Sequence, residues 1–167
     1  MSTCCFFGHR KIDITDEVIK KLRNTIEKLI VEENTDTFLF GCNSQFDDLC
    51  LGITSELKIC YPYVKRIYVR AKFPIINDDY KSYLLKSYEE TYYPDNILNA
   101  GKAAYIKRNQ EMIDKSDFCI IYFDENYIVS KRNKKIQNLQ NKLIKSGTRI
   151  AYDYALKKQK RIINIFD

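Results

Sequence analysis

The sequence predicts an α/β fold, a single-domain, doubly wound sandwich of three layers around a mainly parallel central sheet. First, strand-like runs recur along the chain and alternate with helical stretches: "TCCFFG" at 3–8, "DTFLFG" at 36–41, "VKRIYVRA" at 64–71, "DFCIIYF" at 117–123 and "RIINIF" at 161–166. Second, three of these runs are almost continuously apolar, which is typical of strands covered by helices on both faces. Alternating strands and helices predict right-handed β-α-β units.

Two helices are predicted between the first three strands. Thr15 is placed to cap the first one, and Asp16 and Glu17 then lie in its positive first turn. Apolar residues recur on one face of this helix at Val18, Leu22, Ile26, Leu29 and Ile30. The second helix is expected over 46–60 and ends before Pro62, because the residue before a proline resists helical geometry. Its inward face comprises Phe46, Leu49, Cys50, Ile53 and Leu57.

Helical patterning returns in the second half of the chain. The tyrosine-rich stretch 79–93 is expected to be helical, with a weaker periodicity, and "YYPDN" breaks it. A stronger helix is predicted from about 100 to 115. The last helix is predicted over 148–158, where Ala151 and Ala155 share one face and are small enough to bring the helix close to the sheet. Because no repeat or linker interrupts the pattern, residues 1–167 are interpreted as one domain.

Composition is that of a globular protein, and we expect it in the cytoplasm. Of the 167 residues, 45% are hydrophobic and 30% are charged, which argues against a disordered or membrane-spanning chain. The first residues lack the features of a signal peptide, and no run reaches the roughly 18 apolar residues of a membrane helix. The six cysteines form no C-x-x-C pair and there is a single histidine, so we expect reduced thiols, no metal site and no cofactor.

The formal net charge of +6 fits a partner that carries phosphate groups. Much of the excess lies in a lysine-rich cluster at 131–149, between the fourth strand and the last helix. This cluster could line a groove for single-stranded nucleic acid, with some of the 13 tyrosines stacking on bases. The alternatives are that it attracts a small anion or that it is a solvated face.

Three glycine-bearing loops are expected to share one edge of the sheet. Gly8 follows the first strand, Gly41 follows the second, and Ser146, Gly147 and Thr148 open the last helix. In doubly wound folds, ligands bind outside the carboxyl ends of the strands. Glycine permits close backbone approach, and exposed amides at a helix start bind anions. Together the loops predict a phosphate cradle, although each one alone is equally typical of a turn. The chain has neither a P-loop nor a G-x-G-x-x-G fingerprint, so NTPase and dehydrogenase functions lack support.

Side chains near these loops are candidate ligand contacts. His9 could donate a hydrogen bond or act as an acid or base, and Arg10 could hold a phosphate with two hydrogen bonds; a solvated loop is the alternative for His9. Asp47 either binds a ribose hydroxyl or stabilises the dipole of the second helix. One member of the Arg108-Asn109 pair is expected to point inward as a ligand contact, with a structural salt bridge as the alternative.

Four blocks of sequence, in this order and spacing, resemble the SLOG superfamily: "CCFFGHR", "FGCNSQFDDLCLGI", "YIKRNQEMIDKSDFCIIYF" and "SGTRIAYDYALKKQKRIINI". This Rossmann-like group contains the DprA/Smf proteins and the Lonely Guy phosphoribohydrolases, and the chain looks most similar to the small standalone YpsA/YoqJ-like branch. The resemblance implies a Rossmann-like sheet whose pocket accepts a nucleotide or a nucleotide-derived ligand, such as an ADP-ribose-like molecule. It points to Gly8, His9, Arg10, Gly41, Asp47, Arg108, Asn109, Ser146, Gly147 and Thr148 as the ligand-binding residues.

The last block departs from the pattern of the Lonely Guy enzymes. They have P-G-G-x-G-T-x-x-E, in which the glutamate assists glycosidic cleavage, whereas "KSGTRIAYD" has a shortened glycine run and Ala151 at the glutamate position. Asp153 would point about 200° round the helix from that position. This argues against phosphoribohydrolase activity, unless another acid such as Asp47 or Glu111 substitutes for the glutamate.

The sequence therefore predicts binding of a nucleotide-derived small molecule, as a sensor, a carrier or a sequestering module. The alternative is an enzyme of the nucleotide N-glycosidase or deoxyribosyltransferase type, which needs a carboxylate at the anomeric carbon. The second alternative is single-stranded nucleic-acid binding through the cluster at 131–149. No membrane partner is expected, and the sequence is compatible with a homo-oligomer.

Overall fold

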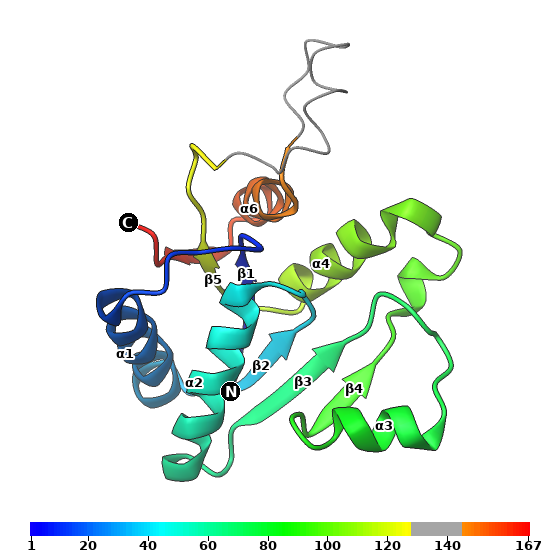
Figure 1. The fold of residues 1–167 in the computed structure, drawn as a ribbon, viewed down its shortest axis with the longest axis horizontal. Coiled ribbons are helices and arrows are strands. Elements are labelled where there is room, and N and C mark those ends of the chain that lie inside the picture. The colour runs from blue at the N-terminus through cyan, green and yellow to red at the C-terminus, as the bar shows by residue number, and fades with distance from the viewer. Residues whose placement is uncertain (128–144) are drawn as a thin grey trace.

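The computed structural model describes residues 1–127 and 145–167 of the chain. They form a six-stranded sheet in which neighbouring strands pair in parallel (Figure 1). Its strands are β1 (Ser2–Gly8), β2 (Thr35–Phe40), β3 (Lys65–Val69), β4 (Glu90–Tyr92), β5 (Phe118–Tyr122) and β6 (Arg161–Asn164). Their order across the sheet is β4-β3-β2-β1-β5-β6, which confirms the predicted α/β class with a Rossmann-like parallel sheet.

Helices cover both faces of this sheet and complete the three layers (Figure 1). One face packs against α1 (Asp16–Glu32) and α2 (Gln45–Cys60), and the other packs against α4 (Ala104–Asp114) and α6 (Gly147–Lys157). The short helix α3 (Asp78–Leu84) lies beside β4 at the edge of the sheet (Figure 1). Two 3₁₀ turns, Asp95–Ile97 and Gly101–Ala103, lead into α4. The helices predicted over 46–60, 100–115 and 148–158 are confirmed to within a few residues.

Alternation along β1 builds a separate hydrophobic core on each face. Phe6 belongs to the core under α1 and α2, whereas Phe7 belongs to the core under α4 and α6, because successive side chains of a strand point to opposite faces. On the second face Ala151 and Ala155 are buried in the core, as their small size predicts. The six cysteines are free thiols, and four of them are buried.

Three of the helices have a serine or threonine side chain as their N-terminal cap. Thr15 precedes α1, Ser44 precedes α2 and Ser146 precedes α6, and each side chain accepts a hydrogen bond from the amide three residues later, at 3.0 to 3.2 Å. Such bonds satisfy amides that the helix itself leaves without an acceptor. They confirm the predicted starts of the first and last helices.

The sequence prediction is wrong for the second half of 79–93. The helix α3 ends at Leu84, and the chain then forms the parallel edge strand β4 instead of continuing as a helix. Three residues are too few to show a strand period. The strand is positioned by a non-local contact, because Glu89 Oε2 accepts from the Arg66 amide at 2.6 Å and Glu89 Oε1 pairs with Arg66 Nη2 at 2.7 Å.

Gly8 ends β1 where α2 comes closest to it. A Cβ at this position would lie 2.4 Å from the Cβ of Phe46, whose side chain is fully buried. Glycine is therefore required here by packing, which brings the first turn of α2 against the end of β1. This contact does not exclude a ligand beside Gly8, but it explains the glycine without one.

We expect Gly8→Ala to lower the free energy of unfolding by about 1–3 kcal/mol, because the added methyl must displace Phe46. Gly52→Ala is the matched control, since Gly52 lies in α2 with open space around it. That change should raise stability by about 0.5–1 kcal/mol through helix propensity. Urea unfolding of the two variants measures both effects. Equal effects of the two substitutions would contradict the packing argument.

Candidate functional site

The strand order reverses between β1 and β5. From β1 the chain builds β2, β3 and β4 to one side, and it then returns to add β5 and β6 on the other side (Figure 1). Parallel pairing places the last residues of these two strands, Gly8 and Tyr122, opposite each other. At such a switch point the loops diverge, and ligands of doubly wound folds bind in the opening.

A hollow of about 400 Å³ lies at this point. The residues that line it come from the end of β5 and from the loops after β1, β5 and β6: His9, Lys11, Ile12, Asp13, Tyr122, Asp124, Tyr127 and Phe166. The lining combines aromatic rings with one lysine, two aspartates and His9, and His9 is the one residue predicted from the sequence that belongs to it.

His9 is held rigidly in the wall of this hollow, with 2% of its surface exposed. Its Nε2 accepts a hydrogen bond from the Asp124 amide at 2.9 Å, and its ring stacks on Tyr127 with centroids 3.8 Å apart. Nε2 also lies 3.3 Å from the Asp124 carbonyl oxygen, and we assign it as the acceptor of the shorter contact with the amide, which places the proton of the neutral ring on Nδ1. This Nδ1 is buried and has no partner among the described residues. The ring therefore presents an unused donor.

Burial lowers the pKa of His9 below its usual 6.5. The Asp124 carbonyl, which can accept from Nε2 once the ring is protonated, and the charge of the Asp124 carboxylate offset part of this effect. The neutral form is therefore favoured at pH 7, and a neutral imidazole suits hydrogen bonding to a ligand. The solvated-loop alternative for His9 does not describe a ring that is buried and stacked in this way.

The start of α6 lies against the same group of rings. Phe123 stacks on Tyr152 of α6 with centroids 4.8 Å apart, Arg149 lies 5.5 Å from the Phe123 ring, and Phe123 is 5.8 Å from His9. Ser146 satisfies the Arg149 amide, which leaves the amides of Gly147 and Thr148 without an acceptor inside the helix. A Cβ at Gly147 would meet no atom within 4 Å. The structure thus brings the predicted helix start close to His9.

Arg108 brings a second group of the predicted residues together. Its side chain is 3% exposed and reaches from α4 across the ends of two strands. Nη1 donates to the carbonyls of Gly41 and of Val69, the latter at 3.0 Å, and Nε donates to Asn109 Oδ1 at 2.8 Å. Gly41 lacks a Cβ for this reason, since the Cβ would lie 2.6 Å from Nη1. Arg108 forms no ion pair with a described carboxylate, so the salt-bridge alternative is not supported.

Asp47 lies in the first turn of α2 with only 4% of its surface exposed. Its Oδ1 has no hydrogen-bond partner among the described residues. Burial raises the pKa of this carboxyl group well above its usual value, and the charge of Arg108 opposes the shift. Asp48, the next residue, is exposed and suits the helix-dipole role instead.

Arg10 follows His9 on the surface of the same edge. Its carbonyl accepts from the Gln45 amide at 2.9 Å, and Gln45 Oε1 accepts from the Ile12 amide at 3.0 Å, so this loop is fixed to the start of α2. Within the described residues its guanidinium takes part in no hydrogen bond or ion pair, and the side chain is exposed.

Three neighbouring strands each lead into a buried polar atom that has no partner. Four such atoms occur among the described residues, and three of them follow in order: His9 Nδ1 after β1, Asp47 Oδ1 in the helix after β2, and Arg70 Nε after β3. Buried polar groups are normally paired, and an unpaired one is costly. Their concentration along one edge is the feature expected of a site that a ligand completes.

The other suggested acids are engaged elsewhere. Asp153 pairs with Lys145 at 2.7 Å and with Arg149 at 3.1 Å, and Glu111 pairs with Lys115 at 2.8 Å. Ala151 is buried in the core under α6. Of the acids considered from the sequence, Asp47 alone combines burial with an unpaired oxygen.

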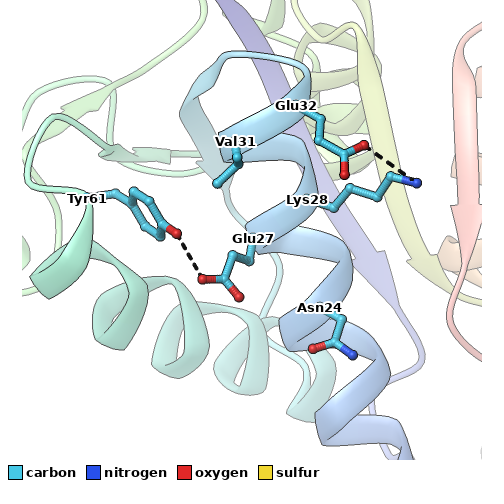
Figure 2. A pocket seen from close by; sticks show the side chains of 6 residues that line it. All are labelled: Asn24, Glu27, Lys28, Val31, Glu32 and Tyr61. Atoms are coloured by element: carbon cyan, nitrogen blue, oxygen red, sulfur yellow. Dashed lines mark hydrogen bonds and ion pairs between the residues drawn. The ribbon is translucent and has the colours of Figure 1, made fainter.

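A second hollow, of about 350 Å³, lies between α1 and the end of α2 (Figure 2). Four of its polar side chains are paired with one another: Tyr61 donates to Glu27 at 2.9 Å, and Lys28 lies 3.7 Å from Glu32. Helices in β-α-β units run antiparallel to the strands, so the carboxyl end of α2 lies at the opposite edge of the sheet from His9. This hollow is therefore not part of the candidate site.

Several expectations fall on other parts of the molecule. Most of the lysine-rich cluster, residues 131–144, lies outside the described residues. Within 1–127 and 145–167 there is no group of three or more His, Cys, Asp or Glu side chains that could hold a metal ion. None of the helices in these ranges is long and apolar enough to cross a membrane.

Neither the models of known protein families nor the curated proteins match this sequence. The assignment of the site therefore rests on the residues and their geometry.

The sequence did not predict the residues that contact His9 or the buried arginine at the end of β3. Asp124 and Tyr127 follow β5 by position, but only the fold shows that they hold His9. Arg70 reads as a strand residue in "VKRIYVRA", and no local signal marks its burial.

Because the chain has one histidine, its ring signals in proton NMR belong to His9. We expect them to titrate with a midpoint below 6.5, since burial disfavours the charged form. The unfolded chain then binds more protons in this window, so His9 makes stability fall as pH drops below about 6.5. His9→Gln should remove that contribution from the pH profile of urea unfolding. A midpoint at or above 6.5 would show that the ring is not held as described.

Proposed function

We propose that this chain binds a nucleotide or a nucleotide-derived ligand, of the ADP-ribose type, at the carboxyl edge of its sheet. The observation that carries the proposal is the row of unpaired polar atoms at His9, Asp47 and Arg70 after three neighbouring strands, with His9 also lining a hollow that has aromatic walls. A phosphorylated nucleoside supplies the matching groups, since its phosphates are acceptors, its ribose hydroxyls are donors and its base stacks.

Each residue of the site has a role that fits its position. Arg10 and the amides at the start of α6 hold phosphate oxygens, because an exposed guanidinium and a helix N-terminus both favour anions. Asp47 accepts from a ribose hydroxyl, and His9 donates through Nδ1 to an oxygen or base nitrogen. Arg108 donates to the Gly41 carbonyl and to the Asn109 side chain, and through these bonds it stabilises the loop at Gly41. We propose that the chain acts in this way as a sensor, a carrier or a sequestering module of the SLOG type.

Gly147 offers the sharpest test, because its surroundings are open and it can be replaced without a clash. We expect Gly147→Asp to stabilise α6 by about 0.3–1 kcal/mol through the helix dipole. The same charge should weaken binding of AMP, NAD, ADP-ribose or a cyclic dinucleotide about tenfold or more, equivalent to about 1.4 kcal/mol. Gly147→Ala is the control, and it should bind as the unmodified protein does. Isothermal titration calorimetry measures the affinities.

Arg10→Ala should weaken the same binding by about 10–100-fold, since a charge-assisted hydrogen bond contributes about 1.5–3 kcal/mol. Lys20→Ala makes the same change of charge at an exposed position on α1 and should have no effect. If none of the four nucleotides binds, or if both the Gly147→Asp and Arg10→Ala proteins bind normally, the proposal is wrong.

The buried carboxyl group of Asp47 supports a second candidate function, an N-glycosidase or deoxyribosyltransferase activity on nucleotides. Its raised pKa is a property of catalytic acids, and its Oδ1 has no other described partner. Incubation with the same nucleotides would then release free base, and Asp47→Asn would abolish the release while Asp48→Asn would not. Binding without base release supports the first function over the second.

A further inference from the structure

Arg70 is a buried cation at the carboxyl end of β3. Only 9% of its surface is exposed, and its amide bonds the Tyr92 carbonyl at 2.8 Å, which fixes its backbone to β4. Nη1 donates to the carbonyl of Phe73 at 2.5 Å, and Nε is buried without a partner. Nη2 makes no hydrogen bond to the described residues. The guanidinium therefore uses one of its nitrogens and leaves the adjacent Nε and Nη2 edge unused.

The charge of Arg70 has no counter-ion in the described parts of the chain. No carboxylate oxygen of the described residues lies within 4.0 Å of it, unlike Arg66 on β3, which pairs with Glu89 at 2.7 Å. The neighbouring side chains that influence the pKa of Arg70 are the phenols of Tyr68, Tyr80 and Tyr93, and no carboxyl group is among them. A buried, unpaired guanidinium is costly, because arginine cannot shed its charge.

Two further cations, Lys72 and Arg108, lie near the loop that follows β3. Lys72 lies 5.5 Å from the centre of the Tyr105 ring, and the guanidinium of Arg108 lies 5.8 Å from the same ring. Arg108 also bonds the carbonyl of Val69, the residue before Arg70. Tyr105 is 47% exposed, so the region around these cations faces solvent. The buried carboxyl group of Asp47 acts on Arg108 and is not among the groups that act on Arg70.

We propose that Arg70, with Lys72, forms an anion subsite at the end of β3 that takes a phosphate group. The Nε and Nη2 edge of a guanidinium matches two phosphate oxygens, and the Phe73 carbonyl holds Arg70 with that edge unoccupied. Lys72 adds a flexible second cation from the same loop.

The subsite also specifies the ligand, and this consequence rests on the proposed function. β3 lies two strands away from β1, so its end is roughly 10 Å from the end of β1. One phosphate cannot reach both Arg70 and the start of α6. A ligand that fills both places carries phosphate groups at separate positions, as a cyclic dinucleotide does, whereas the adjacent phosphates of ADP-ribose or NAD would occupy one of the two places.

The test uses the Nε–H signal of Arg70 in ¹⁵N NMR, assigned by its absence in Arg70→Lys. Titration with inorganic phosphate should shift this signal to saturation, whereas chloride at the same ionic strength should not. Arg70→Gln and Arg70→Lys should weaken phosphate binding about tenfold or more, because the first removes the charge and the second removes the paired donors. Arg66→Lys is the control and should leave phosphate binding unchanged.

Thermal unfolding separates a binding role from a structural one. Phosphate should raise the Tm of the unmodified protein and of Arg66→Lys by more than it raises that of Arg70→Gln, which keeps only the phosphate contacts at Arg10 and the start of α6. An Arg70 signal that phosphate leaves unmoved would overturn the subsite. The subsite would also be wrong if the difference in Tm between the unmodified protein and Arg70→Gln were the same with and without phosphate. Arg70 would then only stabilise the loop through its bond to the Phe73 carbonyl.

Failure of the subsite and failure of the proposed function give different results. If a nucleotide shifts the His9 ring signals but phosphate leaves the Arg70 signal unmoved, the subsite is wrong and the proposed function stands. If phosphate shifts the Arg70 signal but none of the four nucleotides shifts His9, the subsite stands and the proposed function is wrong.

Discussion

The hydrogen bond from the Asp124 amide to His9 Nε2 joins the loops that follow β1 and β5. The two strands pair as far as Gly8 and Tyr122, and one more backbone bond follows, from the His9 amide to the Tyr122 carbonyl at 3.4 Å. The side-chain bond extends this connection across the switch point, and as the shorter contact of Nε2 it is the basis for assigning the proton of the ring. Because Nε2 accepts, the proton lies on Nδ1, and the geometry of the candidate site depends on that assignment.

The same edge of the sheet carries buried polar atoms that have no hydrogen-bond partner among the described residues, although such atoms are normally paired in folded proteins. Asp47 and Arg70 are buried with unused hydrogen-bonding atoms, whereas Arg108, which is equally buried, is satisfied by backbone carbonyls and Asn109. Unpaired buried groups reduce stability, and sites that bind ligands commonly retain them because the ligand completes the bonds. The row from β1 to β3 is the observation on which the proposed ligand site depends.

Local patterns predicted most of the fold. The caps at Thr15 and Ser146 and the continuous apolar strands are encoded within a few residues, so reading them needs no knowledge of distant contacts. β4 was missed because Glu89 holds it through Arg66, which is 23 residues away. The reason for Gly8 is likewise non-local, since it lies in the packing of Phe46.

The candidate site was predictable only in part, for the same physical reason. Sequence placed His9, Asp47 and the start of α6 on one edge, because parallel strands end on the same side. It did not show which member of the Arg108-Asn109 pair points inward or that Arg70 is buried, since both facts depend on how strands β2 to β4 pack beside α4. Spacing alone cannot tell a buried arginine from an exposed one.

The most direct measurement is ¹⁵N NMR of the single histidine, free and with each of the four nucleotides. The account predicts a neutral ring protonated on Nδ1 in the free protein, and a Nδ1 signal that moves more than the Nε2 signal when a nucleotide binds. A ring protonated on Nε2 in the free protein, or a Nδ1 signal that no nucleotide moves, would contradict it.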